Sequence, residues 1–120
     1  MAKRKQQNTL KDVILEAVLE KKGQEIKVLD LRDVQQSIAD YFIICHGNSN
    51  TQVDSISDFI ERQARTELDE KLLHKEGSEN SQWVLLDYGD IVIHVFLEEY
   101  RRFYNLEDLW ADAKIELIEE

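Results

Sequence analysis

The sequence predicts an α/β (α+β) fold: a mixed sheet of four to five strands with helices packed mainly on one face. Apolar residues recur at helical spacing over 9–22 and 50–68, which favours two long amphipathic helices. Four short apolar runs, two of them joined by a turn signal, have the composition of strands. The long helix between the second and third runs has the length of a β–α–β crossover, so parallel pairing is expected beside antiparallel pairing.

Local signals place the ends of these elements. Thr9 or Asn8 can cap the first helix, and Gly23 can end it. Ser49 can cap the second helix, which follows a strand that is apolar on both faces, as a central strand would be. In chain order, the expected elements are a helix over 9–22, strands over 25–31 and 40–46, a helix over 50–68, a β-hairpin over 81–97 and helices over 98–104 and 106–113.

Residues 81–97, SQWVLLDYGDIVIHVFL, form the predicted hairpin. Gly89 can adopt a positive φ in its turn, and a two-residue loop of Tyr88 and Gly89 places Trp83 opposite His94. Because side chains alternate across a strand, one face of the hairpin is wholly aliphatic and suits a covering helix. The other, mixed face carries large apolar side chains beside polar ones: Trp83, Leu85, Asp87, Asp90, Val92, His94 and Phe96. Helices on one side of the sheet only would leave the mixed face exposed.

Length and charge limit the class of protein. A chain of 120 residues with 42% hydrophobic content can form one domain around one core. We expect that domain over 9–113, with a disordered tail at 1–8 and an acidic tail at 114–120. A formal net charge of −10 disfavours direct contact with nucleic-acid phosphates and suits a basic partner.

The cellular compartment is predicted from what the sequence lacks. Cys45 is the single cysteine, so no intrachain disulfide can form and a reducing compartment is favoured. No apolar run approaches the roughly 20 residues that span a bilayer, and the first residues lack the apolar segment of a secretory signal. A cytosolic protein without membrane contact is therefore expected.

Signals for catalysis are weak. Cys45 and His46 are adjacent on a strand and point to opposite faces, which disfavours a thiol–imidazole pair. The three histidines lack the spacing of metal ligands, and common nucleotide-binding and metalloprotease motifs are absent. Asp87 and Asp90 flank a tight turn, where turn formation competes with a role as a carboxylate pair. No metal and no cofactor is therefore expected.

Trp83 is the strongest candidate for a binding residue. Tryptophan is enriched in interaction hot spots because it buries a large rigid area and offers one N–H donor. The alternative is that the C-terminal helix containing Trp110 covers it. Physical argument alone leaves these two interpretations open.

Four segments, VLDLRD, DYFIICHGNSNTQV, ENSQWVLLDYGDIVIHVF and YNLEDLW, resemble the ribosomal silencing factor family, also called Iojap. The resemblance runs from about Leu10 to Trp110 in the same order and spacing. It implies a nucleotidyltransferase-like core that has lost catalysis. It also implies binding to the large ribosomal subunit through ribosomal protein L-fourteen, which blocks association with the small subunit and represses translation under nutrient limitation. Organellar members of the family assist large-subunit assembly.

The family's conserved tryptophan matches Trp83, so the resemblance implies that the mixed face of the hairpin binds the partner. The other predicted binding residues follow by geometry or as rim charge: Leu85, Val92, His94, Phe96, Asp87 and Asp90. Two further hypotheses stay open. One is a residual nucleotide-binding or nucleotidyltransferase-type enzyme that uses Ser49, Asp87 and Asp90. The other is a homodimer of the free protein that buries the same face.

Overall fold

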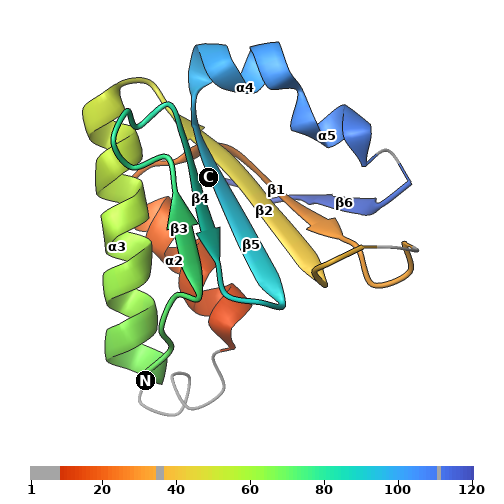
Figure 1. The fold of residues 1–120 in the computed structure, drawn as a ribbon, viewed down its shortest axis with the longest axis horizontal. Coiled ribbons are helices and arrows are strands. Elements are labelled where there is room, and N and C mark those ends of the chain that lie inside the picture. Colours follow the sequence, from red (N-terminus) through yellow and green to blue (C-terminus); the bar gives the residue numbers. More distant parts are fainter. Residues whose placement is uncertain (1–8, 35–36, 111) are drawn as a thin grey trace.

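The computed structural model describes residues 9–34, 37–110 and 112–120, which form one sheet with helices against both of its faces (Figure 1). The helices are α2 (Leu10–Glu20), α3 (Asn50–Leu68), α4 (Glu98–Tyr104) and α5 (Leu106–Leu109). The strands are β1 (Gln24–Asp30), β2 (Tyr41–Gly47), β3 (His74–Glu76), β4 (Trp83–Asp87), β5 (Ile91–Leu97) and β6 (Lys114–Leu117). None of the helices in the described part of the chain is long and apolar enough to cross a membrane.

Six strands form the sheet, in the order β3-β4-β5-β2-β1-β6. β2 and β5 pair in parallel, and every other neighbouring pair is antiparallel. The predicted mixed sheet is therefore confirmed, because the chain leaves β2 through α3 and returns beside β2 as β5. The predicted count of four to five strands is wrong.

Two short edge strands account for the difference. β3 has three residues and lies in a segment predicted to be a loop. β6 lies within 114–120, where the sequence predicts an acidic tail, and pairs antiparallel with β1 from Asp30 opposite Lys114 to Lys27 opposite Leu117. Four residues that alternate charged and aliphatic side chains give a weak strand signal, so pairing with β1 decides the structure. The predicted tail at 1–8 lies outside the described residues.

The first face of the sheet is covered by α2 and α3 (Figure 1). Thr9 caps α2, because its hydroxyl accepts a hydrogen bond from the Asp12 N–H at 3.2 Å. Ser49 caps α3 by accepting from the Gln52 N–H at 3.1 Å. Both predicted caps are thus confirmed. The apolar stripes of the two helices pack on the aliphatic face of the hairpin, as predicted, and they bury the thiol of Cys45.

In the described part of the chain, the helices on the second face are the short α4 and α5, of seven and four residues. At about 1.5 Å per residue they are about 10 and 6 Å long, whereas six strands about 4.8 Å apart are about 24 Å wide. An apolar cluster lies on this face, built mainly from β1, β2 and β5 and closed by Leu106 of α5. The face stays partly open at β4, where Trp83 and Leu85 are only partly buried.

The hairpin forms with a register that differs from the predicted one. Trp83 lies opposite Phe96, not opposite His94 as a two-residue loop would place it. The turn is longer, and the Tyr88 N–H donates to the Ile91 carbonyl at 2.9 Å. Because the register moves by two residues, every side chain keeps its predicted face.

Candidate partner-binding face

Trp83 lies on the open part of the second face and rests on an aromatic platform. Its ring stacks on Phe96 with a centroid separation of 4.9 Å, and Tyr104 of α4 contacts it at 4.8 Å. Phe103 in turn contacts Tyr104 at 5.1 Å. Part of the indole faces solvent while the rest is supported by these rings. A rigid, partly exposed tryptophan of this kind is typical of an interaction hot spot.

The polar atom of the Trp83 indole is bound internally. Trp83 Nε1–H donates to Nδ1 of His94 at 3.1 Å. His94 is 4% exposed, and burial lowers the pKa of its imidazole to about 4, so the ring is neutral near pH 7. Phe42 contacts the same imidazole edge-on, with ring centroids 4.7 Å apart. The imidazole is therefore held between two aromatic side chains.

The seven predicted binding residues fall into a buried and an exposed group. Phe96 is fully buried beneath Trp83, and Val92 and His94 are only 6% and 4% exposed. In this structure these three support the surface instead of forming it. The others reach solvent: Trp83, Leu85 and Asp87 are half-buried, and Asp90 is exposed. A role of the whole set in partner binding stays a prediction.

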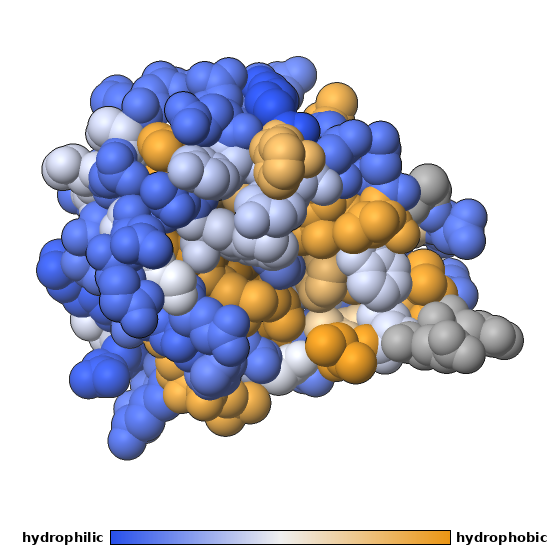
Figure 2. Space-filling model, turned by 45° about the horizontal axis from the view of Figure 1, so that its top comes forward, coloured by the Kyte–Doolittle hydropathy of each residue, from blue (hydrophilic) through white to orange (hydrophobic). Residues whose placement is uncertain are grey.

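Exposed apolar side chains on α4, α5 and the segment before β2 border the second apolar cluster. These side chains and their exposed fractions are Ile38 (85%), Phe103 (78%), Leu109 (74%) and Tyr104 (48%). Figure 2 shows apolar surface through the middle and right of this view, bordered by hydrophilic surface at the left and along the top. Hydropathy in the sequence does not single out these residues, because the exposed side of a two-turn helix depends on how the helix docks.

Carboxylates lie at the hairpin end of this face. The Asp87 carboxylate accepts a hydrogen bond from the Gly89 N–H at 2.7 Å, so it shapes the turn. The Asp90 carbonyl accepts from the N–H groups of Asp40 and Tyr41 at 2.8 and 3.1 Å, which ties the turn to the start of β2. The Asp90 side chain is left exposed as rim charge.

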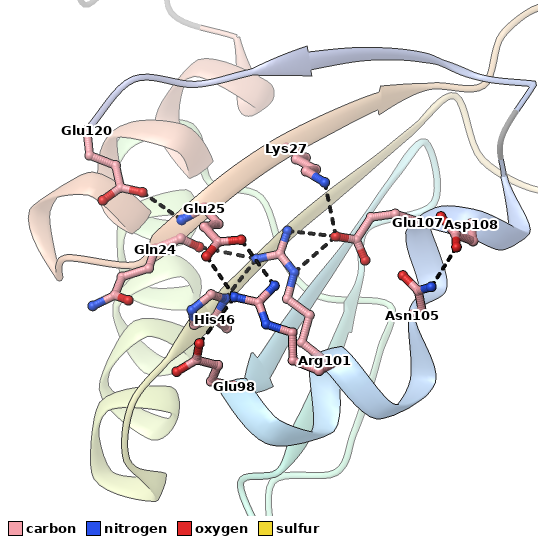
Figure 3. A network of polar contacts seen from close by, with 11 residues as sticks. Gln24, Glu25, Lys27, His46, Glu98, Arg101, Asn105, Glu107, Asp108 and Glu120 are labelled. Carbon is pink, nitrogen blue, oxygen red and sulfur yellow. Dashed lines mark hydrogen bonds and ion pairs between the residues drawn. The ribbon is translucent and has the colours of Figure 1, made fainter.

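A buried guanidinium fixes α4 on the second face (Figure 3). Arg101 is 1% exposed, and its Nε and Nη2 donate to Glu107 at 3.1 and 2.9 Å. Its Nη1 donates to the Gln24 carbonyl at 3.3 Å and to Nδ1 of His46 at 2.9 Å. Lys27 Nζ lies 3.4 Å from the same Glu107 oxygen. The network joins α4 and α5 to β1 and β2, and so positions the aromatic platform.

Glu25, His46 and Glu98 are the group of potential metal ligands found within the described ranges, with ligand atoms within 4.8 Å of one another. Their surroundings do not fit a cation. A guanidinium can only donate, so Arg101 places the lone pair of His46 at Nδ1 and its proton at Nε2. A metal-bound imidazole needs the opposite, an acceptor beside its second nitrogen. Arg102 already pairs with both carboxylates, at 2.7 and 3.1 Å.

The residues of the enzymatic alternative lie far apart. β2 and β5 are parallel with Tyr41 opposite Ile91, so the turn that contains Asp90 lies at the start of β2. Ser49 follows the other end of β2, roughly 20 Å away at the rise of a strand. The hydroxyl of Ser49 also caps α3. The serine and the two turn aspartates therefore do not form one site.

The chain matches the family described as "Ribosomal silencing factor during starvation" over residues 4–120. It is 41% identical to ribosomal silencing factor RsfS of Halalkalibacterium halodurans over 104 residues, which make up 87% of each chain. It is 40% identical to ribosomal silencing factor RsfS of Bacillus subtilis over 112 residues, 91% of each chain. It is also 37% identical to the chloroplastic Iojap protein of Zea mays over 102 residues, which cover 79% of this chain and 42% of that protein.

Two crystal structures are similar to this one. A protein from Bacillus halodurans superposes with a TM-score of 0.76 at 36% identity, over 92% of this chain and 97% of that chain. A protein from Chromobacterium violaceum superposes with a TM-score of 0.79 at 31% identity, over 92% and 91% of the two chains. The arrangement of the α+β layers is therefore shared with experimentally determined relatives.

Replacing Arg101 tests the buried network. Arg101→Met removes the buried guanidinium and leaves the largely buried Glu107 carboxylate without it, which we expect to lower the free energy of unfolding by about 3 kcal/mol. Arg102→Met is the matched control, because Arg102 is half exposed in its ion pairs and its loss is expected to cost under about 1 kcal/mol. Urea unfolding measures both values. Equal losses in the two variants would contradict a special role for Arg101.

The buried histidines predict a loss of stability in mild acid. Burial lowers the pKa of His94 to about 4, and burial and the Arg101 charge lower that of His46, while both are near 6.5 in an unfolded chain. Below pH 6.5 the unfolded chain binds protons that the folded chain does not, so the free energy of unfolding falls as the pH falls. We expect His94 alone to account for about 2 kcal/mol between pH 7 and pH 5.

Urea unfolding at these two pH values measures the effect. His94→Asn, which has no titrating group at this position, is expected to lose less stability than the wild type over the same interval. The same loss in both proteins would show that His94 is not the buried titrating group.

Proposed function

The chain belongs to the ribosomal silencing factor family, and from that premise we propose that it represses translation by binding the large ribosomal subunit and blocking its association with the small subunit. The proposed point of contact is ribosomal protein L-fourteen, which the family resemblance implies. The names of the curated relatives support the silencing function. We propose that the protein acts in the cytoplasm.

The observation that carries the proposal is the setting of Trp83. The indole stacks on buried Phe96, contacts Tyr104 at its side and keeps part of its surface in solvent. A side chain held in this way loses little conformational entropy when a partner covers it, which is one reason why rigid aromatic residues dominate binding energies. Trp83, Leu85 and the exposed side chains of α4 are the proposed contact residues.

Charge supports the same kind of partner. The chain carries a formal net charge of −10, and the exposed carboxylate of Asp90 lies at the hairpin end of the candidate face. Ribosomal proteins are basic as a class, and complementary charge speeds the encounter of two proteins. In the proposal, apolar contacts at Trp83 provide affinity and the carboxylates provide orientation.

The proposed mechanism is steric and requires no reaction. We also propose that the sheet belongs to a nucleotidyltransferase-like core that has lost catalysis. The distance between Ser49 and the Asp87–Asp90 turn supports the absence of catalysis, because both groups would have to meet at one substrate. Calorimetric titration with ATP and magnesium checks this part, and saturable binding would restore the enzymatic alternative.

Replacing Trp83 tests the function directly. Wild-type protein is expected to co-sediment with free large subunits and to be absent from small subunits and joined ribosomes. Trp83→Ala is expected to weaken binding by about 2 kcal/mol or more, about 30-fold, because hot-spot truncations have this effect. Leu19→Ala on α2 is a control, since Leu19 is partly exposed on the opposite helical layer. A folded Trp83→Ala protein with unchanged affinity would remove Trp83 from the site.

The same apolar face is proposed to pair two copies of the free protein. An isologous dimer would bury Trp83 of both copies and would have to dissociate before the ribosome could bind. Sedimentation equilibrium of the free chain is expected to give a dimer that Trp83→Ala weakens. A monomer at all concentrations, or a dimer that Trp83→Ala does not affect, would refute pairing through this face.

A further inference from the structure

We infer that His94 is a positioning residue for partner binding: it holds the Trp83 indole in its binding orientation and withdraws the indole N–H from the interface. The inference rests on the proposed function, because it concerns the face through which the partner is proposed to bind. It assigns His94 a role behind the interface, in place of the direct contact that the sequence predicts.

The register of the hairpin sets up this contact. Trp83 lies opposite Phe96 on β5, and His94 lies opposite Leu85 on β4. Trp83 and His94 are therefore diagonal neighbours on one face, a separation that large side chains can bridge. The indole extends along the sheet over both β5 side chains, stacking on Phe96 at 4.9 Å and donating to His94 at 3.1 Å. A hydrogen bond and a ring contact together define the rotamer of Trp83.

The imidazole is itself fixed. Phe42 contacts it edge-on from β2, and the ring is 4% exposed, so close packing around it restricts its movement. Since Nδ1 accepts from Trp83, the proton of the neutral ring lies on Nε2. That nitrogen is buried without a hydrogen-bond partner among the described residues. Among the described residues, the hydrogen bond from Trp83 is thus the one side-chain hydrogen bond that orients this ring.

The arrangement specifies the chemistry of the partner surface. An indole has a single polar hydrogen, and here His94 uses it. The exposed part of Trp83 then offers only apolar ring surface, so the matching site on the partner is an apolar recess that needs no hydrogen-bond acceptor. Polar recognition falls to the rim, where Asp90 can pair with basic groups.

Loss of the acceptor has a defined consequence. Without the His94 acceptor, the Trp83 N–H forms a hydrogen bond to water or to another acceptor. The indole then samples further rotamers and must be ordered again when the partner binds. The entropy cost of ordering one such side chain lowers the affinity by about three- to tenfold. The effect is expected mainly in binding, since the hydrophobic platform beneath the ring is unchanged.

Two substitutions of nearly equal size at position 94 separate the effect of the hydrogen-bond acceptor from the effect of side-chain volume. His94→Asn can place its Oδ1 where the Nδ1 acceptor lies, whereas His94→Leu has the same branching without an acceptor. The first readout needs no partner: nitrogen-15 NMR of the free protein resolves the indole N–H signals of its two tryptophans. Trp83→Phe assigns the Trp83 signal by its loss, and Trp110 is the internal reference.

The expected result is slow hydrogen exchange of the Trp83 N–H in the wild type and in His94→Asn, and fast exchange in His94→Leu. Affinity for purified large subunits is expected to fall about three- to tenfold in His94→Leu relative to His94→Asn. In a Trp83→Phe background, which lacks the N–H, the two substitutions should bind equally. That last comparison stays informative if both substitutions lower stability.

Unchanged exchange in His94→Leu would overturn the inference, as would equal affinities of the Asn and Leu variants with Trp83 intact. If the wild type itself fails to bind large subunits, the proposed function fails, and with it the part of the inference that concerns the partner. The exchange measurement would then still decide, without a partner, whether His94 holds Trp83.

Discussion

The unequal covering of the two faces of the sheet is the constraint on which the rest of the molecule depends. On the first face, α3 alone has 19 residues and is about 28 Å long, at least as long as the seven-residue strands that it runs beside. On the second face, α4 and α5 together have 11 residues in two separate pieces. Apolar side chains that these short helices cannot cover must face solvent or a partner. The candidate face is therefore a product of helix length.

Buried polar contacts decide which part of the second face stays open. Arg101 ties α4 and α5 to β1 and β2 through Glu107, Gln24 and His46. At the other side of the same face, His94 ties Trp83 to β5. Arg101 and His94 are both buried polar groups with defined hydrogen-bond partners, and such groups are compatible with few alternative packings. Together they turn an incompletely covered sheet into a fixed surface.

The alternation of side chains along the strands predicted which residues lie on each face of the sheet, because an error of two residues in register leaves the faces unchanged. The hairpin register differs by two residues from the predicted one, yet Trp83 lies on the predicted face, since a shift of two preserves alternation. β6 could not be predicted, because four exposed residues become a strand only through their pairing with β1. The role of Arg101 could not be predicted either, because its partners Gln24 and His46 lie 77 and 55 positions away in the chain.

The most direct test of the account is the rate at which purified subunits join, followed by light scattering as increasing amounts of the protein are added to the large subunit first. The account predicts that joining is suppressed once protein and large subunits are equimolar, and that the Trp83→Ala protein leaves joining unaffected at the same concentration. Normal joining with the wild-type protein bound to the joined ribosome would contradict a steric block.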